Sequence, residues 1–258
     1  MPFMPSTNLD AAYFDAWYAD MAGSPARDAV ITGALGLPPE LRDAGTLTWQ
    51  GIAEVAAELQ LPEGGLLLDM ACGRGGYGIE IARRAGARLV GVDISAVALS
   101  VAEATGGERL PGRAVFQTGT LTASGLAGGS VDGLMCLDAV QFAEPPLAAM
   151  AEFRRLLVPG GRLALTCWEA TEPDDAQVPA RIRAVDLRRD LVAAGFAEVE
   201  VWEKPQWRAA ERALWEAAMV ADGSDPAVRA MQVEGRRSLD TFGSLRRVFA
   251  TATAPAPE

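Results

Sequence analysis

Two carboxylates and a set of glycines stand where the chain could hold a nucleotide-like cofactor. Asp69 lies near the end of the apolar segment 66–70, and Asp93 directly follows a second apolar segment, 89–92. Between the two acids lie three glycines with the spacing G-x-G-x-x-G: Gly73, Gly75 and Gly78. A unit of strand, glycine loop, helix and strand binds such cofactors at the carboxyl edge of a parallel sheet.

The position of Asp69 bears on which cofactor this is. In a dinucleotide site the first glycine ends the strand, so that backbone amides face a pyrophosphate. Here Asp69 precedes Gly73 by four residues and would place negative charge beside the phosphates. A carboxylate instead favours a ligand with an ammonium and a sulfonium group and no phosphate, which describes S-adenosylmethionine. Asp93 can accept hydrogen bonds from ribose hydroxyls in either cofactor and does not choose between them.

The composition and charge of the chain limit which partners other than the cofactor we expect. The chain has 258 residues, half of them hydrophobic, and a formal net charge of −11. This negative charge disfavours a nucleic-acid or membrane-surface partner, and no segment has the apolar length of a membrane span, so we expect a cytoplasmic protein. The absence of histidine removes the commonest general base and zinc ligand, and no metal site is expected. The three cysteines lack metal-ligand spacing and are expected to be buried, reduced thiols.

Strands and helices alternate through the middle of the chain. The hydrophobic patterning predicts five strands, at 66–70, 89–92, 113–117, 131–137 and 162–168. Helices are predicted between them at 75–85, 96–104 and 146–157. Short connections between such elements predict right-handed crossovers and a parallel sheet with helices on both faces.

The two ends of the chain have a different pattern. Three helices are predicted before the sheet, at 9–21, from Pro25 to about Gly36, and at 49–59. After it we expect a helix at 182–194, a strand at 196–203, helices at 208–220 and 225–238, and a closing strand at 245–253. We therefore divide the chain into an N-terminal helical cap, 1–63, and a core, 64–258, with a helical lid inserted at about 206–240.

Several segments together resemble the motifs of class I S-adenosylmethionine-dependent methyltransferases. They comprise Leu68–Gly75, Val90–Ser95, Gly119–Leu121, Ser130–Phe142 and Arg155–Leu163. The chain looks like the small-molecule enzymes of actinomycete natural-product pathways, relatives of the ubiquinone and sterol methyltransferases. The resemblance implies a doubly wound, Rossmann-like α/β fold with a seven-stranded, mostly parallel sheet, whose last strand is antiparallel and follows the helical insertion.

The resemblance also implies which residues contact S-adenosylmethionine. The methionine end would lie against one group: Asp69, Ala71, Gly73 and Arg74. The adenosine would lie against a second group, with Asp93 at the ribose: Asp93, Ile94, Thr120 and Leu121. Leu137 would border the methyl-transfer space. Apart from the resemblance, the helix at 9–21 carries an aromatic face that either packs as core or forms a lid over the site. In the second case Trp17 is expected to reach the cofactor.

Catalysis needs few groups in this chemistry. Methyl transfer is an in-line displacement, so the protein chiefly aligns the reactants and excludes water. A base is needed only when the acceptor arrives protonated and is a poor nucleophile. Asp138 is the best placed candidate, ahead of Glu144 and the tyrosines of the cap, and a structural hydrogen-bonding role is its alternative. The resemblance makes Gln141 the second catalytic candidate and places it, with Asp138, at the border of the methyl-transfer space. The sequence departs from the family pattern in two places: the pair Gln141-Phe142 replaces a histidine often found after the fourth strand, and Thr120 replaces the acid usually found after the glycine of the third motif.

Three functions stay open on the sequence alone. The first is methyl transfer to an oxygen, nitrogen or carbon of a small, largely apolar metabolite. The second is a methyltransferase-fold protein that binds S-adenosylmethionine but catalyses a non-methylating reaction such as cyclisation. The third, a nicotinamide-dependent oxidoreductase, rests only on the glycine spacing. The sequence also leaves a homodimer open.

Overall fold

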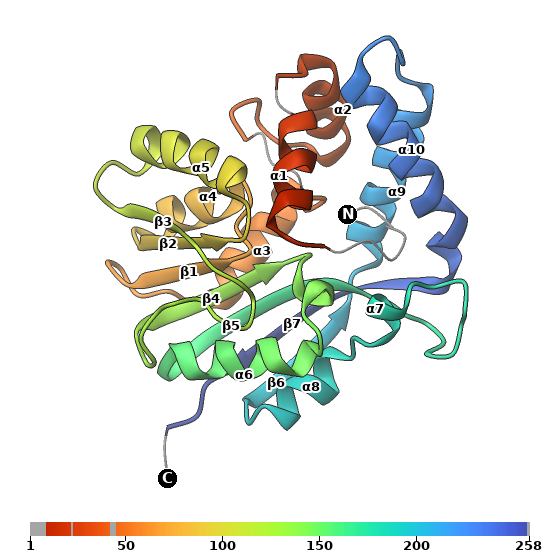
Figure 1. The fold of residues 1–258 in the computed structure, drawn as a ribbon. Helices are drawn as coiled ribbons and strands as arrows, with labels where there is room; N and C mark the ends of the chain where they lie inside the picture. Colours follow the sequence, from red (N-terminus) through yellow and green to blue (C-terminus); the bar gives the residue numbers. More distant parts are fainter. Residues whose placement is uncertain (1–8, 22, 42–44, 257–258) are drawn as a thin grey trace.

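A computed structural model describes residues 9–21, 23–41 and 45–256 of the chain. Its centre is a seven-stranded sheet of order β3-β2-β1-β4-β5-β7-β6 (Figure 1). The strands are β1 (Leu66–Met70), β2 (Arg88–Asp93), β3 (Ala114–Thr118), β4 (Val131–Leu137), β5 (Leu157–Ala170), β6 (Ala197–Glu203) and β7 (Leu245–Thr253). β7 is antiparallel to both of its neighbours and the other pairs are parallel. The predicted fold class is confirmed.

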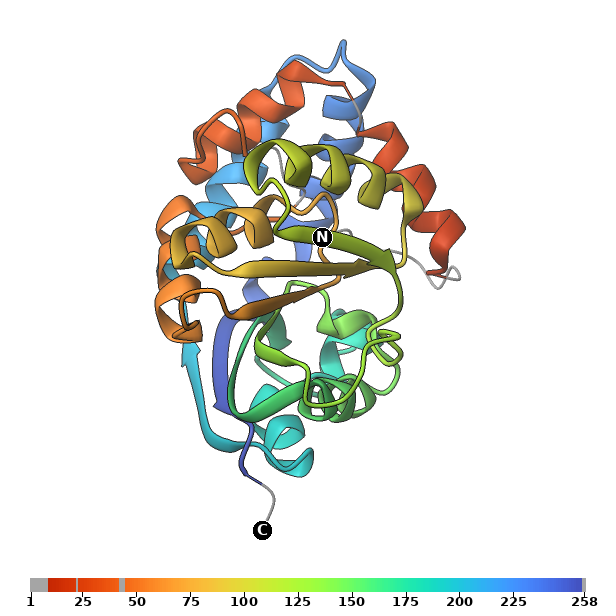
Figure 2. The same cartoon turned by 90° about the vertical axis from the view of Figure 1, so that its left-hand side faces the viewer.

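Helices cover both faces of this sheet. They are α1 (Ala11–Asp20), α2 (Pro25–Leu35), α3 (Trp49–Leu59), α4 (Gly76–Ala85), α5 (Ala96–Arg109), α6 (Pro146–Leu156), α7 (Ala180–Arg183), α8 (Leu187–Ala193), α9 (Pro205–Val220) and α10 (Pro226–Thr241), with short 3-10 turns η1 (Val140–Phe142) and η2 (Phe242–Ser244). Figures 1 and 2 show α3, α4 and α5 on one face and α6 and α8 on the other.

Successive residues of the central strands point to opposite faces of the sheet and pack into the two halves of the core. On β1, Leu67 packs into the half that contains α3 and α4, and Leu68 into the half that contains α6 and α8. Both side chains are fully buried. Strands covered on both faces lose the alternation of polar and apolar residues, which is why these segments read as continuous apolar runs.

Local signals set the helix ends that position the site. Ser24, Thr48 and Ser95 each accept a hydrogen bond from a backbone amide in the first turn of the helix that follows, at 3.0–3.1 Å. These caps satisfy donors that the helix itself leaves unpaired. Gly36 ends α2 in the left-handed conformation, with a φ of 64°. The predicted starts of α2, α3 and α5 and the predicted end of α2 are confirmed, whereas α5 continues to Arg109, beyond its predicted end at 104.

Two other predicted elements differ from the structure for a cause that can be named. The expected helix 182–194 is two helices, α7 and α8, because Asp186 has an extended φ of −144° and its side chain caps α8 by accepting from the Arg189 amide at 3.0 Å. β5 begins at Leu157, earlier than predicted, since Leu157 already pairs with Val131 before the register shifts around the Pro-Gly-Gly turn. In both cases a tertiary contact or a side-chain cap overrides the apolar pattern.

In the sequence, α9 and α10 come between β6 and β7. In space they pack against each other and against α2 (Figure 1). α3, by contrast, packs on α4 and on strands β4 and β5. The division into a cap at 1–63, a core and a lid at about 206–240 stays a prediction, and parts of that cap lie outside the described residues. Within the described ranges, no helix combines the length and apolar character needed to cross a membrane.

Candidate active site

The glycine loop between β1 and α4 is tied to the end of β2 by Asp93. The Gly73 amide donates to Asp93 Oδ2 at 2.8 Å, and the Ser95 amide donates to Oδ1 at 2.8 Å. Gly73 has a φ of 54°, and a β-carbon there would lie 2.5 Å from the Tyr18 hydroxyl oxygen. Glycine is required at this position because the backbone is left-handed and a side chain from α1 lies directly against it.

A cavity of about 230 Å³ opens beside this loop at the carboxyl edge of the sheet. Its walls come from α1, the ends of β1 and β2, the loop after β3 and the turn after β4: Leu9, Phe14, Tyr18, Met70, Ala71, Val92, Asp93, Ile94, Gly119, Thr120, Leu121, Thr122, Ala139, Phe142, Ala143 and Glu144. The charged residues among these described walls are Asp93 and Glu144, and none is basic. Such walls suit a cationic or neutral ligand better than a pyrophosphate.

Five of the residues predicted to contact the cofactor line this cavity: Ala71, Asp93, Ile94, Thr120 and Leu121. Asp93 is only 6% exposed, and a carboxylate oxygen can accept more than one hydrogen bond. Ala71 has a φ of 61°, an unusual conformation for a residue with a β-carbon. This backbone turn presents Ala71 to the cavity at the end of β1.

Asp69 does not line the cavity, although the sequence argument gave it the deciding role. It is 3% exposed, and a β-carbon on Gly78 would lie 2.5 Å from its Oδ2 atom. The carboxylate therefore lies beneath the first turn of α4, where the helix dipole favours a negative charge. Leu137, also predicted beside the cofactor, packs in the hydrophobic core instead. A direct contact of Asp69 with the ligand stays a prediction that this geometry does not favour.

The aromatic face of α1 is split between two cavities. Phe14 and Tyr18 line the cavity beside the glycine loop, and the Phe14 ring meets Phe142 edge-to-face at 5.6 Å. Trp17, the residue predicted to reach the cofactor, lines a separate cavity of about 70 Å³ with Trp215 and Met231. Helical spacing indicated an aromatic face but could not say which of its members turns toward the glycine loop.

Arg74 also lies outside the cavity beside the glycine loop. It lines an open cleft of about 650 Å³ between α2, α5 and the start of α4. Its Nη2 atom lies 3.5 Å from the Tyr18 carbonyl oxygen, which it can reach as a donor, and the side chain is 8% exposed. Arg74 thus contacts the backbone of α1, and the expected contact with a methionine carboxylate stays a prediction.

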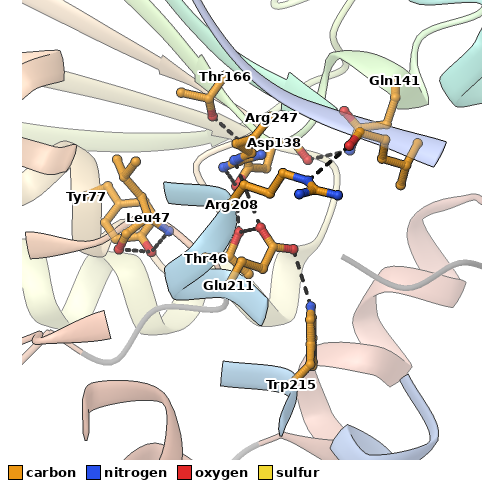
Figure 3. A network of polar contacts seen from close by, with 11 residues as sticks. Thr46, Leu47, Tyr77, Asp138, Gln141, Thr166, Arg208, Glu211, Trp215 and Arg247 are labelled. Atoms are coloured by element: carbon orange, nitrogen blue, oxygen red, sulfur yellow. Dashed lines mark hydrogen bonds and ion pairs between the residues drawn. The ribbon is translucent and has the colours of Figure 1, made fainter. Parts of the chain in front are cut away.

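Asp138 follows β4 and is the centre of a buried polar network (Figure 3). Its Oδ2 atom accepts from Arg247 Nη2 at 2.7 Å, and its Oδ1 atom accepts from the Thr166 hydroxyl at 2.6 Å. Burial alone would raise the pKa of Asp138, but the charge and hydrogen bonds of Arg247 outweigh it, so the pKa lies below its usual value. A carboxylate held in this way is a weak base, which argues against the predicted catalytic role.

Glu211 of α9 completes the network from the opposite side. Its Oε2 atom accepts from the Thr46 hydroxyl at 2.8 Å and lies 3.9 Å from Arg247 Nε, while Trp215 Nε1 approaches Oε1 at 3.4 Å. Burial raises the pKa of Glu211 above its usual value, although Arg247 opposes this shift. Sequence reasoning missed Glu211, because a glutamate on an amphipathic helix normally marks the solvent-facing side.

Gln141, the second predicted catalytic residue, lies in the 3-10 turn η1 and is 4% exposed. Its Nε2 atom donates to the Asp138 carbonyl oxygen at 2.7 Å. Its Oε1 atom accepts no hydrogen bond from any residue within the described ranges. The Gln141 side chain lines a small cavity together with Glu211. Its neighbours Ala139 and Phe142 line the cavity beside the glycine loop.

Comparison with known proteins identifies the family to which this arrangement corresponds. Residues 68–165, from β1 into β5, match the model of a family described as "Methyltransferase domain". These residues form a methyltransferase domain. The match confirms the resemblance inferred from the motifs, and the domain contains the glycine loop, Asp93, Thr120, Asp138 and Gln141.

Individual relatives agree with this assignment. The O-methyltransferase resE of Aspergillus sclerotiorum is 27% identical over 159 residues, a stretch covering 57% of this chain and 60% of that protein. The phosphoethanolamine N-methyltransferase 2 of Haemonchus contortus, solved with S-adenosyl-L-methionine, is 16% identical with a TM-score of 0.74, covering 94% of this chain and 60% of that one. The chain thus spans about 60% of the length of these relatives.

A second solved structure matches this chain almost from end to end. The [4+2]-cyclase SpnF is 22% identical with a TM-score of 0.69, and the alignment covers 96% of this chain and 97% of that one. At these sequence identities the solved structures establish only the fold of the chain. They do not fix the reaction, because one fold serves several chemistries.

Proposed function

We propose that the protein transfers a methyl group from S-adenosylmethionine to a small, largely apolar metabolite. The proposal rests above all on one observation: the cavity beside the glycine loop of a methyltransferase domain has carboxylates as its only charged walls among the described residues. A pyrophosphate would be repelled there, whereas an ammonium and a sulfonium group would be attracted. A nicotinamide-dependent oxidation is therefore disfavoured.

The residues of the cavity fit the parts of this cofactor. Asp93 would accept hydrogen bonds from the ribose hydroxyls while it continues to bind the Gly73 and Ser95 amides. Ile94 and Leu121 would pack on the two faces of the adenine, and Thr120 offers a hydroxyl at its rim. Phe14 and Tyr18 of α1 would cover the site and exclude water.

The chemistry asks mainly for alignment. S-adenosylmethionine supplies a methyl carbon already activated by positively charged sulfur. The protein holds the acceptor atom in line with that carbon, and the aromatic side chains around the site keep competing water away. Asp138 would act as a positioning residue, since its bond to Thr166 and its ion pair with Arg247 fix the turn that carries Gln141.

A second function follows from one specific comparison. The [4+2]-cyclase SpnF matches this chain over nearly its whole length, so a non-methylating reaction in the same fold is the alternative. Incubation with S-adenosylmethionine and a panel of phenols, amines and enolisable ketones, followed by mass spectrometry, separates the two. Products heavier by one methylene group, with S-adenosylhomocysteine formed in equal amount, support methyl transfer; turnover without either contradicts it. A cytoplasmic location and a homodimer stay predictions.

A further inference from the structure

A second, smaller cavity lies behind the turn that forms one wall of the cofactor cavity. Its volume is about 20 Å³, and its walls come from η1, β5, α7, α9, α10 and the start of β7: Gln141, Trp168, Arg181, Ile182, Glu211, Ser238, Phe242 and Leu245. The two cavities adjoin at η1, since Phe142 lines the first and its neighbour Gln141 the second. A group bound here therefore lies beside the site that we propose for the cofactor.

The polar atoms of this small cavity are arranged for a hydrogen-bond donor. Gln141 Oε1 is buried and accepts no hydrogen bond from the described residues. Leaving such a carbonyl without a partner costs free energy, so a ligand that donates to it would be favoured. Glu211 supplies a second acceptor on the same wall. The volume corresponds to one hydroxyl group, because a cavity of this size holds about one water-sized group.

The charges around the cavity balance. Asp138 and Glu211 face Arg247 from either side, and Arg181 of α7 lines the same cavity. On the far side of Thr46, Asp20 of α1, Arg27 of α2 and Glu234 of α10 line the next cavity. A neutral donor fits between Glu211 and Arg181 better than an ammonium, which the arginine would repel. An oxyanion formed there would be stabilised by the same arginine.

We propose that Glu211 is the proton acceptor for the hydroxyl group of a phenolic or enolic methyl acceptor, which Gln141 orients from the cofactor side. This inference rests on the proposed function. The acceptor oxygen forms a bond to the methyl carbon while the bond from that carbon to sulfur breaks, the electron pair goes to sulfur, and the hydroxyl proton goes to Glu211. The rings of Trp168 and Phe242, 5.3 Å apart, form two walls of the cavity. Because the cavity has room for only about one hydroxyl group, side chains of its walls must shift to admit the acceptor ring.

The raised pKa of Glu211 is consistent with this role. A general base works best when its pKa is near the working pH, and burial moves this glutamate in that direction. Asp138 moves in the opposite direction because it has the closer contact with Arg247. The two carboxylates of one network therefore have different roles, Asp138 as the counter-ion and Glu211 as the base.

The test uses the full-length protein saturated with S-adenosylhomocysteine, with 4-nitrophenol as the probe, because its phenolate absorbs visible light. In the wild-type protein the negative charge of Glu211 raises the pKa of the bound nitrophenol. In Glu211→Gln that charge is absent and Arg181 remains, so we expect the phenolate to appear about one pH unit or more lower. Glu216→Gln, the same change at an exposed position of α9, should leave the pKa of the probe unchanged.

Calorimetric titration of each variant with S-adenosylhomocysteine distinguishes a failure of the role assigned to Glu211 from a failure of the proposed function. Undiminished cofactor affinity in Glu211→Gln shows that the variant folds, and loss of probe binding in Gln141→Leu supports the second contact independently. Equal nitrophenol pKa values in the wild-type and Glu211→Gln proteins, or no binding of the probe to the wild-type complex, would overturn the assignment of Glu211. Failure of the wild-type protein to bind S-adenosylhomocysteine would instead overturn the proposed function.

Discussion

Asp138 and Arg247 form an ion pair from which water is excluded. Arg247 Nη2 donates to Asp138 Oδ2 at 2.7 Å, Nη1 lies against Oδ1, and the arginine side chain is fully buried. The pair joins the end of β4 to β7, two strands separated in the sheet by β5. It thereby fixes the turn on which Gln141 stands, at the boundary between the two cavities.

Removal of the arginine should be costly. In Arg247→Met two buried carboxylates lose their counter-ion, and we expect the free energy of unfolding to fall by about 3–5 kcal/mol. Arg212→Met, which breaks an exposed ion pair with Glu216 on α9, should change it by no more than about 0.5 kcal/mol. Urea unfolding followed by circular dichroism measures both, and equal losses in the two variants would argue that the buried pair has no special role.

Glu152 of α6 should make stability depend on pH. Burial would raise its pKa, but hydrogen bonds from Arg155 and Ser124 outweigh this and lower the pKa to about 2. Because the pKa is lower in the folded than in the unfolded protein, the stabilisation is complete above about pH 4.3, the ordinary value for glutamate, and is lost as the pH falls toward 2.

The variant Glu152→Gln tests this dependence. A shift of this size corresponds to roughly 3 kcal/mol at neutral pH. We therefore expect Glu152→Gln to be less stable than the wild-type protein by about 2–3 kcal/mol at pH 7, with the difference shrinking toward zero near pH 2. A difference that is constant across this range, measured by urea unfolding at each pH, would contradict the assigned ionisation.

The aromatic residues of α1 should differ in their effect on cofactor binding. Phe14 lines the cavity beside the glycine loop, so Phe14→Ala should weaken the binding of S-adenosylhomocysteine by about 3- to 10-fold, as expected for the loss of an aromatic contact. Trp17 lines the other cavity, and Trp17→Ala should change the affinity by less than about 2-fold. The reverse order of effects in calorimetric titration would restore Trp17 as the cofactor contact.

The sequence predicts the frame of this molecule better than the orientation of its side chains. The succession of strands and helices along the chain follows from apolar runs and short connections, and the caps at Ser24 and Ser95 follow from residue types whose preferences are local. Asp69 shows the limit: its position at the end of β1 is predicted correctly, but its carboxylate lies beneath α4 because Gly78 leaves room there. Such a contact depends on how the helix packs on the strand.

Glu211 and Arg247 show the same limit more strongly. They are 36 residues apart in the sequence and 109 residues separate Asp138 from Arg247, so no local pattern relates the three. β7 brings the arginine to Asp138 only because it inserts between β5 and β6 in the opposite direction. Without that pairing, Arg247 reads as a charged residue near the start of an apolar strand.

The central claim is that this cavity holds S-adenosylmethionine, with Asp93 at the ribose. Calorimetric titration of S-adenosylhomocysteine and of NAD into the wild-type protein and Asp93→Asn tests it most directly, with Asp222→Asn, an exposed loop position, as the control. We predict that the wild-type and control proteins bind S-adenosylhomocysteine and not NAD, and that Asp93→Asn loses at least about 10-fold in affinity, as expected for hydrogen bonds to a charged group. Undiminished affinity in Asp93→Asn, or binding of NAD in place of S-adenosylhomocysteine, would contradict the account.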